Sequence, residues 1–285
     1  MEIPHKLAYL NGGGRAWRAV CEDPRYDLGR RELASLAHLM SQVVPRLPQR
    51  TVNVLHLGPG TGREVAIVVD AVGPANIRQY GVVDISVDLL GLAGAVVADR
   101  LGPERMRRFE HDLNRRGLAR LTQTLRNERA SCNLLVLAGN GGILSDLSCL
   151  GWIEEAMEGE DRLLVILEFY EPARERDILD QFRIPTILNL FGRCLAPLGV
   201  CDPQPTEFEV VYSPETALLE IYFIPAPSRR ALQISDRLRL FASFRPTPER
   251  LRATLESFQF QVLCFETFSE ERCCGAICCV SEGRR

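Results

Sequence analysis

The sequence has few of the features that mark nucleic-acid binding, membrane insertion or secretion. Its 285 residues carry a formal net charge of −3, with acidic and basic residues interspersed, so no basic surface is expected for a nucleic acid. It has no long uncharged apolar run and no signal-peptide core, so we expect a cytoplasmic protein that does not contact a membrane. The chain is long enough to bury a sizeable core.

Several common catalytic and metal-binding patterns are also missing. The four histidines are spread along the chain and form no ligand set, and there is no Ser-His-Asp arrangement or P-loop lysine. The most noticeable of the ten cysteines are two pairs, Cys273-Cys274 and Cys278-Cys279. Structural zinc sites favour Cys-x2-Cys spacing at a turn, whereas these pairs flank Gly275–Ile277 in an expected strand. We interpret them as small apolar residues and predict no metal.

The most informative stretch runs from Val52 into a glycine-rich turn. Val52–Leu57 is an apolar strand, Gly58, Gly60 and Gly62 follow at alternate positions, and an apolar helix opens at Glu64. Without a Cβ, these glycines allow a sharp turn and a ligand lying against the backbone. Asp84 ends the next apolar strand, 26 positions after Gly58, where a carboxylate can accept hydrogen bonds from a ribose diol. The pattern predicts a nucleoside-cofactor site.

The form of the loop distinguishes between cofactors. A dinucleotide fold would use GxGxxG with a helix N-terminus facing a pyrophosphate, but the third glycine is not at that spacing and Pro59 removes an N–H. The loop resembles that of class I S-adenosylmethionine (SAM) methyltransferases, whose ligand carries no phosphate. In such enzymes an acidic residue lies near the adenine, where Asp112 falls here. We therefore favour SAM, with S-adenosylhomocysteine as product, over NAD.

The remaining elements predict an α/β fold with a doubly wound, Rossmann-like sheet. Residues 5–50 are expected to form a helical cap, and buried strands are expected at Asn133–Ala138 and Arg162–Phe169. After Pro172 we expect one helix over 174–195 and then three runs of strand character, 208–212, 217–224 and 238–244. A helix beginning after Thr247 and strands at 261–267 and 274–280 would complete the sheet. We predict a methyltransferase-like domain of residues 1–170 and 246–285, with residues 171–245 as an antiparallel α+β insertion that selects the substrate.

Several motifs together resemble the histidine-specific, SAM-dependent methyltransferase family. The matches run almost end to end: Lys6 and Tyr9, the segment Pro24–Glu32, the Leu-Gly-x-Gly loop, Val83–Ser86 and the late segment Ser243–Leu251. The best-known member of this family trimethylates the α-amine of histidine. The resemblance implies a class I methyltransferase fold, SAM as cofactor and a small-molecule substrate.

Four departures fall in functional segments of the family pattern. His56 replaces an acidic residue two positions before the first loop glycine, Asp27 replaces the second tyrosine of a Tyr-Tyr pair, and Ile143 replaces an asparagine after strand four. Phe241 replaces a glutamate that resembles a contact to the amino-acid substrate. Losing that carboxylate removes the charge partner of a zwitterion, so histidine is an unlikely substrate.

The resemblance and the chain pattern together give a set of candidate site residues. For the cofactor these are Tyr9, Gly58, Pro59, Gly60, Thr61, Gly62, Asp84, Ile85, Asp112, Leu113 and Ala138. For the substrate they are Asn140, Tyr170, Phe241 and Ser243. Candidate catalytic residues, which would accept or strip a proton from an amine, are Asp27, Tyr26 and Glu168. Each has a structural alternative: Asp27 could cap a turn or pair with Arg30, Tyr26 could be core, Glu168 could be an exposed strand end, and Asn140 could only hold its loop.

The predicted function is SAM-dependent methylation of a small molecule, on nitrogen of an amino-acid-derived or secondary-metabolite substrate other than histidine. Positioning is the main demand of methyl transfer, so no nucleophilic residue is needed. Two alternatives stay open: the fold could catalyse a different reaction, such as an intramolecular displacement or cyclisation, or serve as a non-catalytic partner subunit. A monomer or homodimer is expected.

Overall fold

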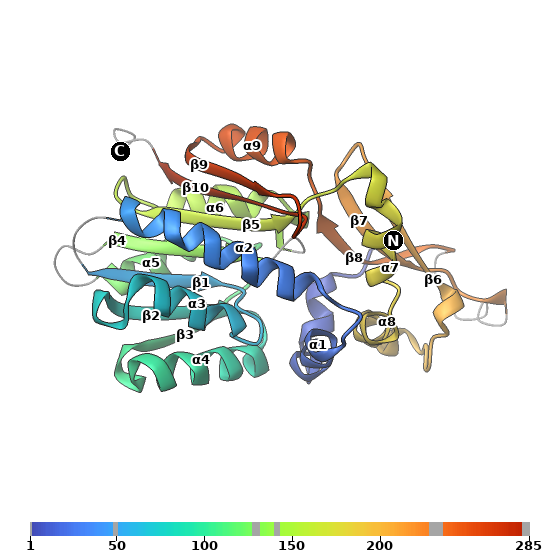
Figure 1. Cartoon of the computed structure of the whole chain (residues 1–285). Helices are drawn as coiled ribbons and strands as arrows, with labels where there is room; N and C mark the ends of the chain where they lie inside the picture. The colour runs from blue at the N-terminus through green and yellow to red at the C-terminus, as the bar shows by residue number, and fades with distance from the viewer. Residues whose placement is uncertain (1, 48–50, 127–131, 140–142, 228–235, 281–285) are drawn as a thin grey trace.

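A computed structural model of the chain describes residues 2–47, 51–126, 132–139, 143–227 and 236–280, and is built on a twisted central sheet (Figure 1). Within these residues, seven strands form the sheet in the order β3-β2-β1-β4-β5-β10-β9. Their bounds are β1 Val52–Leu57, β2 Ile77–Asp84, β3 Met106–Glu110, β4 Cys132–Ala138, β5 Arg162–Glu168, β9 Phe260–Phe268 and β10 Cys273–Val280. Strands β1 to β5 are parallel, and β10 pairs antiparallel with both β5 and β9. The predicted doubly wound α/β class is confirmed.

Helices cover both faces of this sheet, which explains why its inner strands are apolar throughout. The helices are α2 Leu28–Val43, α3 Arg63–Val72 and α4 Val87–Leu101 on one face, with α5 Leu118–Arg126, α6 Ser148–Ala156 and α9 Pro248–Ser257 on the other (Figure 1). All residues of β1 and β4 are buried. Central parallel strands that have no face toward solvent consist of nearly continuous apolar runs, and the sequence has such runs at β1 and β4.

A second, smaller sheet lies beside the end of the first and carries one wall of the site. It is antiparallel, in the order β6 Phe208–Ser213, β7 Leu218–Phe223 and β8 Leu238–Phe244. It shares a hydrophobic cluster with α1 Gly13–Glu22, α7 Glu175–Gln181 and α8 Pro185–Gly192. The three strands lie where the sequence predicted them, and the division of the chain into a main domain and a substrate-selecting insertion stays a prediction.

The expected single helix over 174–195 is wrong. Helix α7 ends at Gln181, α8 begins at Pro185, and a 3-10 segment over Arg193–Leu198 follows. Pro185 has no N–H to donate to the preceding turn and restricts the residue before it, so it begins a new helix instead of continuing the old one.

The main chain links the two sheets close to the ends of β5 and β8. Tyr170 N donates to Pro246 O at 3.0 Å and so joins the end of β5 to the residues after β8, while Phe169 N donates to Arg272 O at 3.0 Å within the large sheet. At the N-terminus, Ile3 N donates to Arg239 O at 2.9 Å and so ties the first residues to β8. Of these bonds, the one from Tyr170 joins the smaller sheet to the carboxyl end of β5.

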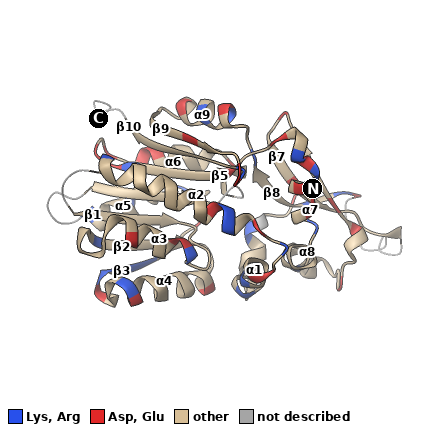
Figure 2. Cartoon of the chain, viewed as in Figure 1, with Lys and Arg blue, Asp and Glu red and all other residues tan. Residues whose placement is uncertain are grey.

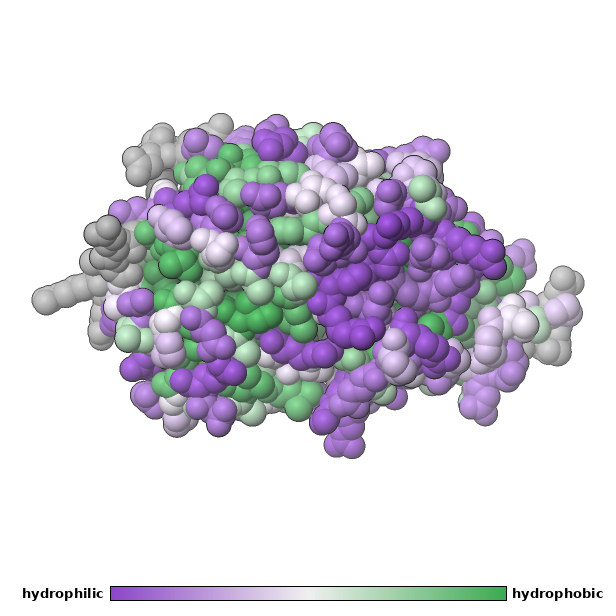
Figure 3. Space-filling model, in the orientation of Figure 1, coloured by the Kyte–Doolittle hydropathy of each residue, from purple (hydrophilic) through white to green (hydrophobic). Residues whose placement is uncertain are grey.

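Charge and hydropathy are mixed over the face in view. Figure 2 shows basic and acidic residues interspersed along the chain, as the sequence indicated. Hydrophilic side chains gather over α7 and the beginning of α2 (Figure 3), where Asp27, Arg31 and Asp177 lie. No helix in the described residues has the length and apolarity needed to cross a membrane.

Candidate functional site

A cavity opens at the carboxyl ends of β1, β2 and β4, with a wall from the smaller sheet and helices α1, α2 and α8. Its lining includes the glycine loop, Asp84 at the end of the second strand, Asp112 after the third and Ala138 at the end of the fourth. Phe241 and Arg245 line it from the side of β8. This is the edge at which open parallel α/β sheets bind ligands, next to the switch point between β1 and β4.

The three glycines of the loop have positive φ angles, a conformation in which a residue with a side chain would be strained. Gly58, Gly60 and Gly62 have φ of 65°, 54° and 82°. A Cβ on Gly60 would lie 3.2 Å from Trp17 Nε1, so the loop passes directly beneath that indole. Gly62 has a different role: its Cβ would lie 2.8 Å from the Cα of Ala93, so this glycine allows α3 to pack closely on α4.

Asp84 is a buried acceptor at the end of β2. Its side chain receives a backbone hydrogen bond from Ser86 N at 2.9 Å. Burial raises the pKa of Asp84 to about 6, although hydrogen bonds from the backbone of Ser86, Ile85 and Gly60 favour the charged form. A diol that donates to this carboxylate would relieve part of the cost of burying it.

Asp112 closes the other end of the cavity together with Lys6, the only lysine in the sequence. The ammonium Nζ of Lys6 lies 2.6 Å from Asp112 Oδ2, and Asn114 N donates to Oδ1 at 3.1 Å. Burial opposes ionisation of Asp112, but the hydrogen bonds from Lys6 and Asn114 outweigh it and lower the pKa. Leu89 and Leu113 line the cavity between the two carboxylates, so this half offers two acceptors and an apolar slot, which fits a nucleoside.

His56 does not reach the cavity. It is fully buried under the loop, with Nδ1 2.9 Å from Tyr80 Oη. Burial lowers the pKa of His56 to about 3, so the imidazole is neutral. Where the family pattern has an acidic residue, this chain therefore has a histidine whose hydrogen bond with Tyr80 lies in the core beneath the loop. A carboxyl does occur nearby: Glu64 lines the cavity, and burial raises its pKa to about 7.

The opposite half of the cavity combines aromatic walls with unpartnered polar atoms. Phe241 stacks on Phe191 with ring centroids 4.3 Å apart and on Phe182 at 6.0 Å. Among the described residues, Glu32 Oε1, Ser243 Oγ and Arg245 Nη1 are buried without a hydrogen-bond partner, although all three residues line the cavity. Buried polar groups are normally paired, so these atoms indicate where a ligand would bind.

Comparison with known proteins agrees with this geometry. A family model described as "Histidine-specific methyltransferase, SAM-dependent" matches residues 1–172, more than half of the chain. The chain belongs to this family. It is thus a SAM-dependent methyltransferase, and the predicted enzyme class and cofactor are confirmed. Among curated proteins, no sequence matches significantly.

Solved structures show the same fold at low sequence identity. A 1,6-didemethyltoxoflavin N1-methyltransferase of Burkholderia thailandensis, with bound 1,6-didemethyltoxoflavin and S-adenosylhomocysteine, is 12% identical with a TM-score of 0.50, over 99% of this chain and 92% of its own. A methyltransferase of Haloferax volcanii, in complex with a methyltransferase activator, is 10% identical with a TM-score of 0.51, over 98% and 99%. At these identities the likeness concerns the fold alone.

In this methyltransferase, most predicted cofactor residues do line the cavity. They are Tyr9, Gly58, Pro59, Gly60, Thr61, Asp84, Ile85, Asp112, Leu113 and Ala138. Tyr26, Phe241 and Ser243 also line it. Gly62 packs between helices instead, and Asn140 lies outside the described residues.

Three predicted residues lie elsewhere. Within the described part of the chain, Asp27, Glu168 and Tyr170 are not part of the cavity lining. Asp27 pairs with Arg31 at 3.1 Å instead of Arg30. Glu168 is a fully buried strand end, not an exposed one, and it is surrounded by arginines. Tyr170 stacks on Tyr212, with ring centroids 3.7 Å apart.

Sequence reasoning did not single out Glu32 and Arg245. Both stand inside segments that carry the family resemblance, Pro24–Glu32 and Ser243–Leu251, so a signal was present. Their burial against the cavity could not be read from one sequence. Phe182 and Phe191 carried no signal, because aromatics in an expected helix are usually core.

Proposed function

We propose that this methyltransferase transfers a methyl group to an amine nitrogen of an amino-acid-derived or secondary-metabolite acceptor other than histidine. The observation that supports this proposal best is Glu32, a carboxyl group that is 6% exposed, lines the cavity and has an oxygen without a hydrogen-bond partner among the described residues. Burial raises its pKa to about 8, even though Arg245 nearby favours the charged form. Above that pH the carboxyl is ionised and can accept a proton from an amine, so the rate of methyl transfer should rise as the pH passes through about 8.

The order of the strands divides the cavity into two halves. Asp84 ends β2 and Asp112 follows β3, on the side of the glycine loop. Glu32 lies on the other side, against Gly139 after β4, because a Cβ on Gly139 would lie 2.5 Å from Glu32 Oε2. The nucleoside half and the acceptor half thus meet near Ala138.

The chemistry asks little of the protein beyond positioning and proton transfer. SAM, when bound, supplies an electrophilic methyl group on its sulfonium, so that an N–C bond forms from the amine lone pair as the S–C bond breaks and S-adenosylhomocysteine remains. Glu32 would take the proton that the amine releases. Tyr26 lines the same half, and burial raises the pKa of its hydroxyl well above the usual value, so it stays a donor that can orient the acceptor.

The walls of the acceptor half favour an apolar or aromatic amine. Phe241 occupies the position at which the family pattern has a glutamate, and Phe191 and Phe182 pack against it. At position 241 a ring thus stands where the family pattern has a charge partner for an amino-acid zwitterion, which argues against histidine. The Burkholderia thailandensis structure is that of an N1-methyltransferase with 1,6-didemethyltoxoflavin bound, so the shared fold is compatible with N-methylation of a small molecule.

The test is a methyl-transfer assay against a panel of arylalkyl and heteroaromatic amines. We expect release of S-adenosylhomocysteine with a product that NMR shows to be methylated on nitrogen. Glu32→Gln should lower kcat by about 10²–10⁴-fold and remove the dependence of kcat on a group of pKa near 8. Glu256→Gln, on the exposed side of α9, is the matched control and should leave kcat unchanged.

Two results would contradict the proposal. Methylation on oxygen or carbon would show that the nucleophile is not an amine. Full turnover by Glu32→Gln with an unchanged pH profile would show that this carboxyl does not handle the proton.

A further inference from the structure

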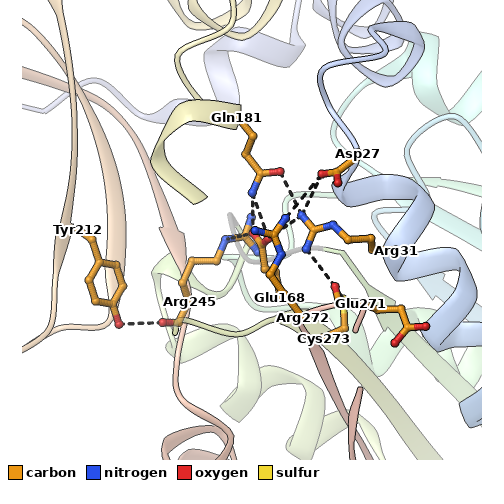
Figure 4. A network of polar contacts seen from close by, with 9 residues as sticks. All are labelled: Asp27, Arg31, Glu168, Gln181, Tyr212, Arg245, Glu271, Arg272 and Cys273. Carbon is orange, nitrogen blue, oxygen red and sulfur yellow. Dashed lines mark hydrogen bonds and ion pairs between the residues drawn. The ribbon is translucent and has the colours of Figure 1, made fainter. Parts of the chain in front are cut away.

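Figure 4 shows a network of ion pairs and hydrogen bonds that includes Arg245, a residue that also lines the cavity. The centre of the network is Glu168, fully buried at the end of β5. Oε1 of Glu168 accepts a hydrogen bond from Arg31 Nη2 at 2.8 Å, and Gln181 Nε2 donates to both oxygens at 3.0 and 3.1 Å. Arg245 Nε lies 3.6 Å from Oε2, and Arg272 Nη2 lies 4.0 Å from Oε1. One carboxylate is therefore shared by three guanidinium groups.

The charges of this network do not balance within it. Besides Glu168, the carboxylate that contacts these arginines is Asp27, 3.1 Å from Arg31 and 3.8 Å from Arg272. Three cations thus face two anions. Glu32 lies close to Arg245 but, with a pKa of about 8, is mostly protonated at neutral pH. Below a pH of about 8, one positive charge of the network has no counter-ion among the described residues, and a buried unpaired charge is costly.

Arg245 is the member of the network that carries this excess charge into the cavity. It is 2% exposed, lines the cavity, and its Nη1 has no hydrogen-bond partner among the described residues. Ser243, two residues earlier, offers a second donor, its Oγ, which also has no hydrogen-bond partner in the described part of the chain. Arg31 and Arg272 pair with Asp27, which does not line the cavity, so part of their charge is already compensated there.

The position of Arg245 is fixed, as a binding residue requires. Its backbone N donates to Ala217 O at 2.7 Å, and its carbonyl accepts a hydrogen bond from Tyr212 Oη at 2.9 Å. The guanidinium lies 5.5 Å from the ring centroid of Phe182. A guanidinium held in this way loses little side-chain entropy when it binds an oxyanion.

We propose that Arg245 and Ser243 bind an anionic group of the methyl acceptor, so that the acceptor carries a carboxylate or a similar oxyanion at the end remote from the cofactor. The inference rests on the proposed function in placing the acceptor in this half of the cavity. Arg245 packs against Glu168 of β5, and β5 is separated from the glycine loop of β1 by β4. The anion is therefore assigned to the acceptor and not to the amino-acid tail of the cofactor.

The test measures binding without turnover, so its failure can be told apart from failure of N-methylation. The protein is saturated with S-adenosylhomocysteine and titrated by calorimetry with 3-phenylpropionate and with its neutral amide. We expect the carboxylate to bind at least about tenfold more tightly, the size of a charge-assisted hydrogen bond. Arg245→Met should abolish this preference, and Arg245→Lys should keep part of it.

Controls separate binding from folding. Arg252→Met removes an exposed arginine of α9 and should bind the carboxylate as wild type does. Because Arg245→Met leaves Glu168 with one cation fewer, thermal unfolding has to show that the variant is folded, and Arg245→Lys tests the same contact with the charge kept. Ser243→Ala should weaken carboxylate binding by a smaller factor.

Three outcomes overturn the proposal. The first is equal binding of acid and amide by the wild-type protein, and the second is no measurable binding of the carboxylate. The third is a loss of SAM affinity in Arg245→Met without a loss of affinity for methylthioadenosine, which lacks the amino-acid tail. That result would assign Arg245 to the carboxylate of the cofactor.

Discussion

Glu32 and Gly139 are in direct contact: a Cβ built on Gly139 would lie 2.5 Å from Glu32 Oε2. Gly139 is the first residue after β4 and has a φ of 68°, which L-residues with side chains rarely adopt. The glycine therefore leaves space for a carboxyl group at the carboxyl end of a central strand. The position of the proposed proton acceptor depends on this missing side chain.

Gly139→Ala should impair catalysis more than folding. The new methyl displaces the end of a flexible side chain, while the left-handed backbone costs about 1–2 kcal/mol of stability. Displacement of Glu32 should lower kcat at least about tenfold, because small misplacements of reacting groups are costly. Initial-rate kinetics and urea unfolding measure the two effects. Gly91→Ala in α4 is the control: no atom lies within 4 Å of the new Cβ, and we expect a gain of about 0.4–1 kcal/mol with unchanged kcat.

Gly62→Ala should destabilise the protein. Its Cβ would lie 2.8 Å from the Cα of Ala93, and its φ is 82°. Overpacking and the strained backbone together should cost about 2–4 kcal/mol in urea unfolding. In the double variant with Ala93→Gly, part of this loss should be recovered beyond additivity. Strictly additive losses would show that the clash is with the Ala93 Cα, which Ala93→Gly keeps, and that the Ala93 Cβ at 3.3 Å adds nothing to it.

Cofactor affinity should weaken as the pH falls through about 6, the pKa of buried Asp84. Because this pKa is raised in the folded state, the free protein is more stable with Asp84 protonated and loses that stability as the pH rises from 3.8 towards 6. A bound diol donates to the ionised form, so SAM should bind best above this range. Calorimetric titrations over pH 5–8 test this. Asp84→Asn should bind weakly and lose the Asp84 component of the pH dependence, although Glu64, with a pKa of about 7, faces the same cavity.

Lys6 offers a chemical reporter of cofactor binding, because the chain has no other lysine. Its side chain lines the cavity and pairs with Asp112 at 2.6 Å. Saturation with S-adenosylhomocysteine should slow acylation of Lys6 severalfold, as measured by mass spectrometry of its peptide. Asp84→Asn should show no protection at the same ligand concentration. Equal labelling of wild type with and without ligand would show that the cofactor lies away from Lys6.

Much of the cofactor half was predictable from sequence because its geometry is local. The strand, the glycine turn, the helix and Asp84 follow one another within a single βαβ unit, so their spacing fixes where they meet. Gly62 was the exception: its neighbour Ala93 belongs to the next helix, and only the packed structure shows that this glycine serves helix contact.

The acceptor half was harder to predict because its residues come from distant segments. Glu32, Phe182 and Arg245 are brought together only by the packing of α2, α7 and β8 around the sheet. Glu168 was predicted as a candidate catalytic residue from its place at a strand end. A single sequence does not show that Arg31, Arg245 and Arg272 surround it. A carboxylate at the edge of the sheet can hold an ion-pair network instead of facing the ligand.

The most direct test of the account is a parallel titration of wild type, Asp84→Asn and Glu32→Gln with SAM, combined with a check of folding by thermal unfolding. The central claim is that Asp84 belongs to the cofactor half of the cavity and Glu32 to the acceptor half. We predict that Asp84→Asn weakens SAM binding by about tenfold to a hundredfold, while Glu32→Gln binds SAM as wild type does within about threefold. If Glu32→Gln loses SAM affinity as strongly as Asp84→Asn, Glu32 binds the cofactor and the division of the cavity is wrong.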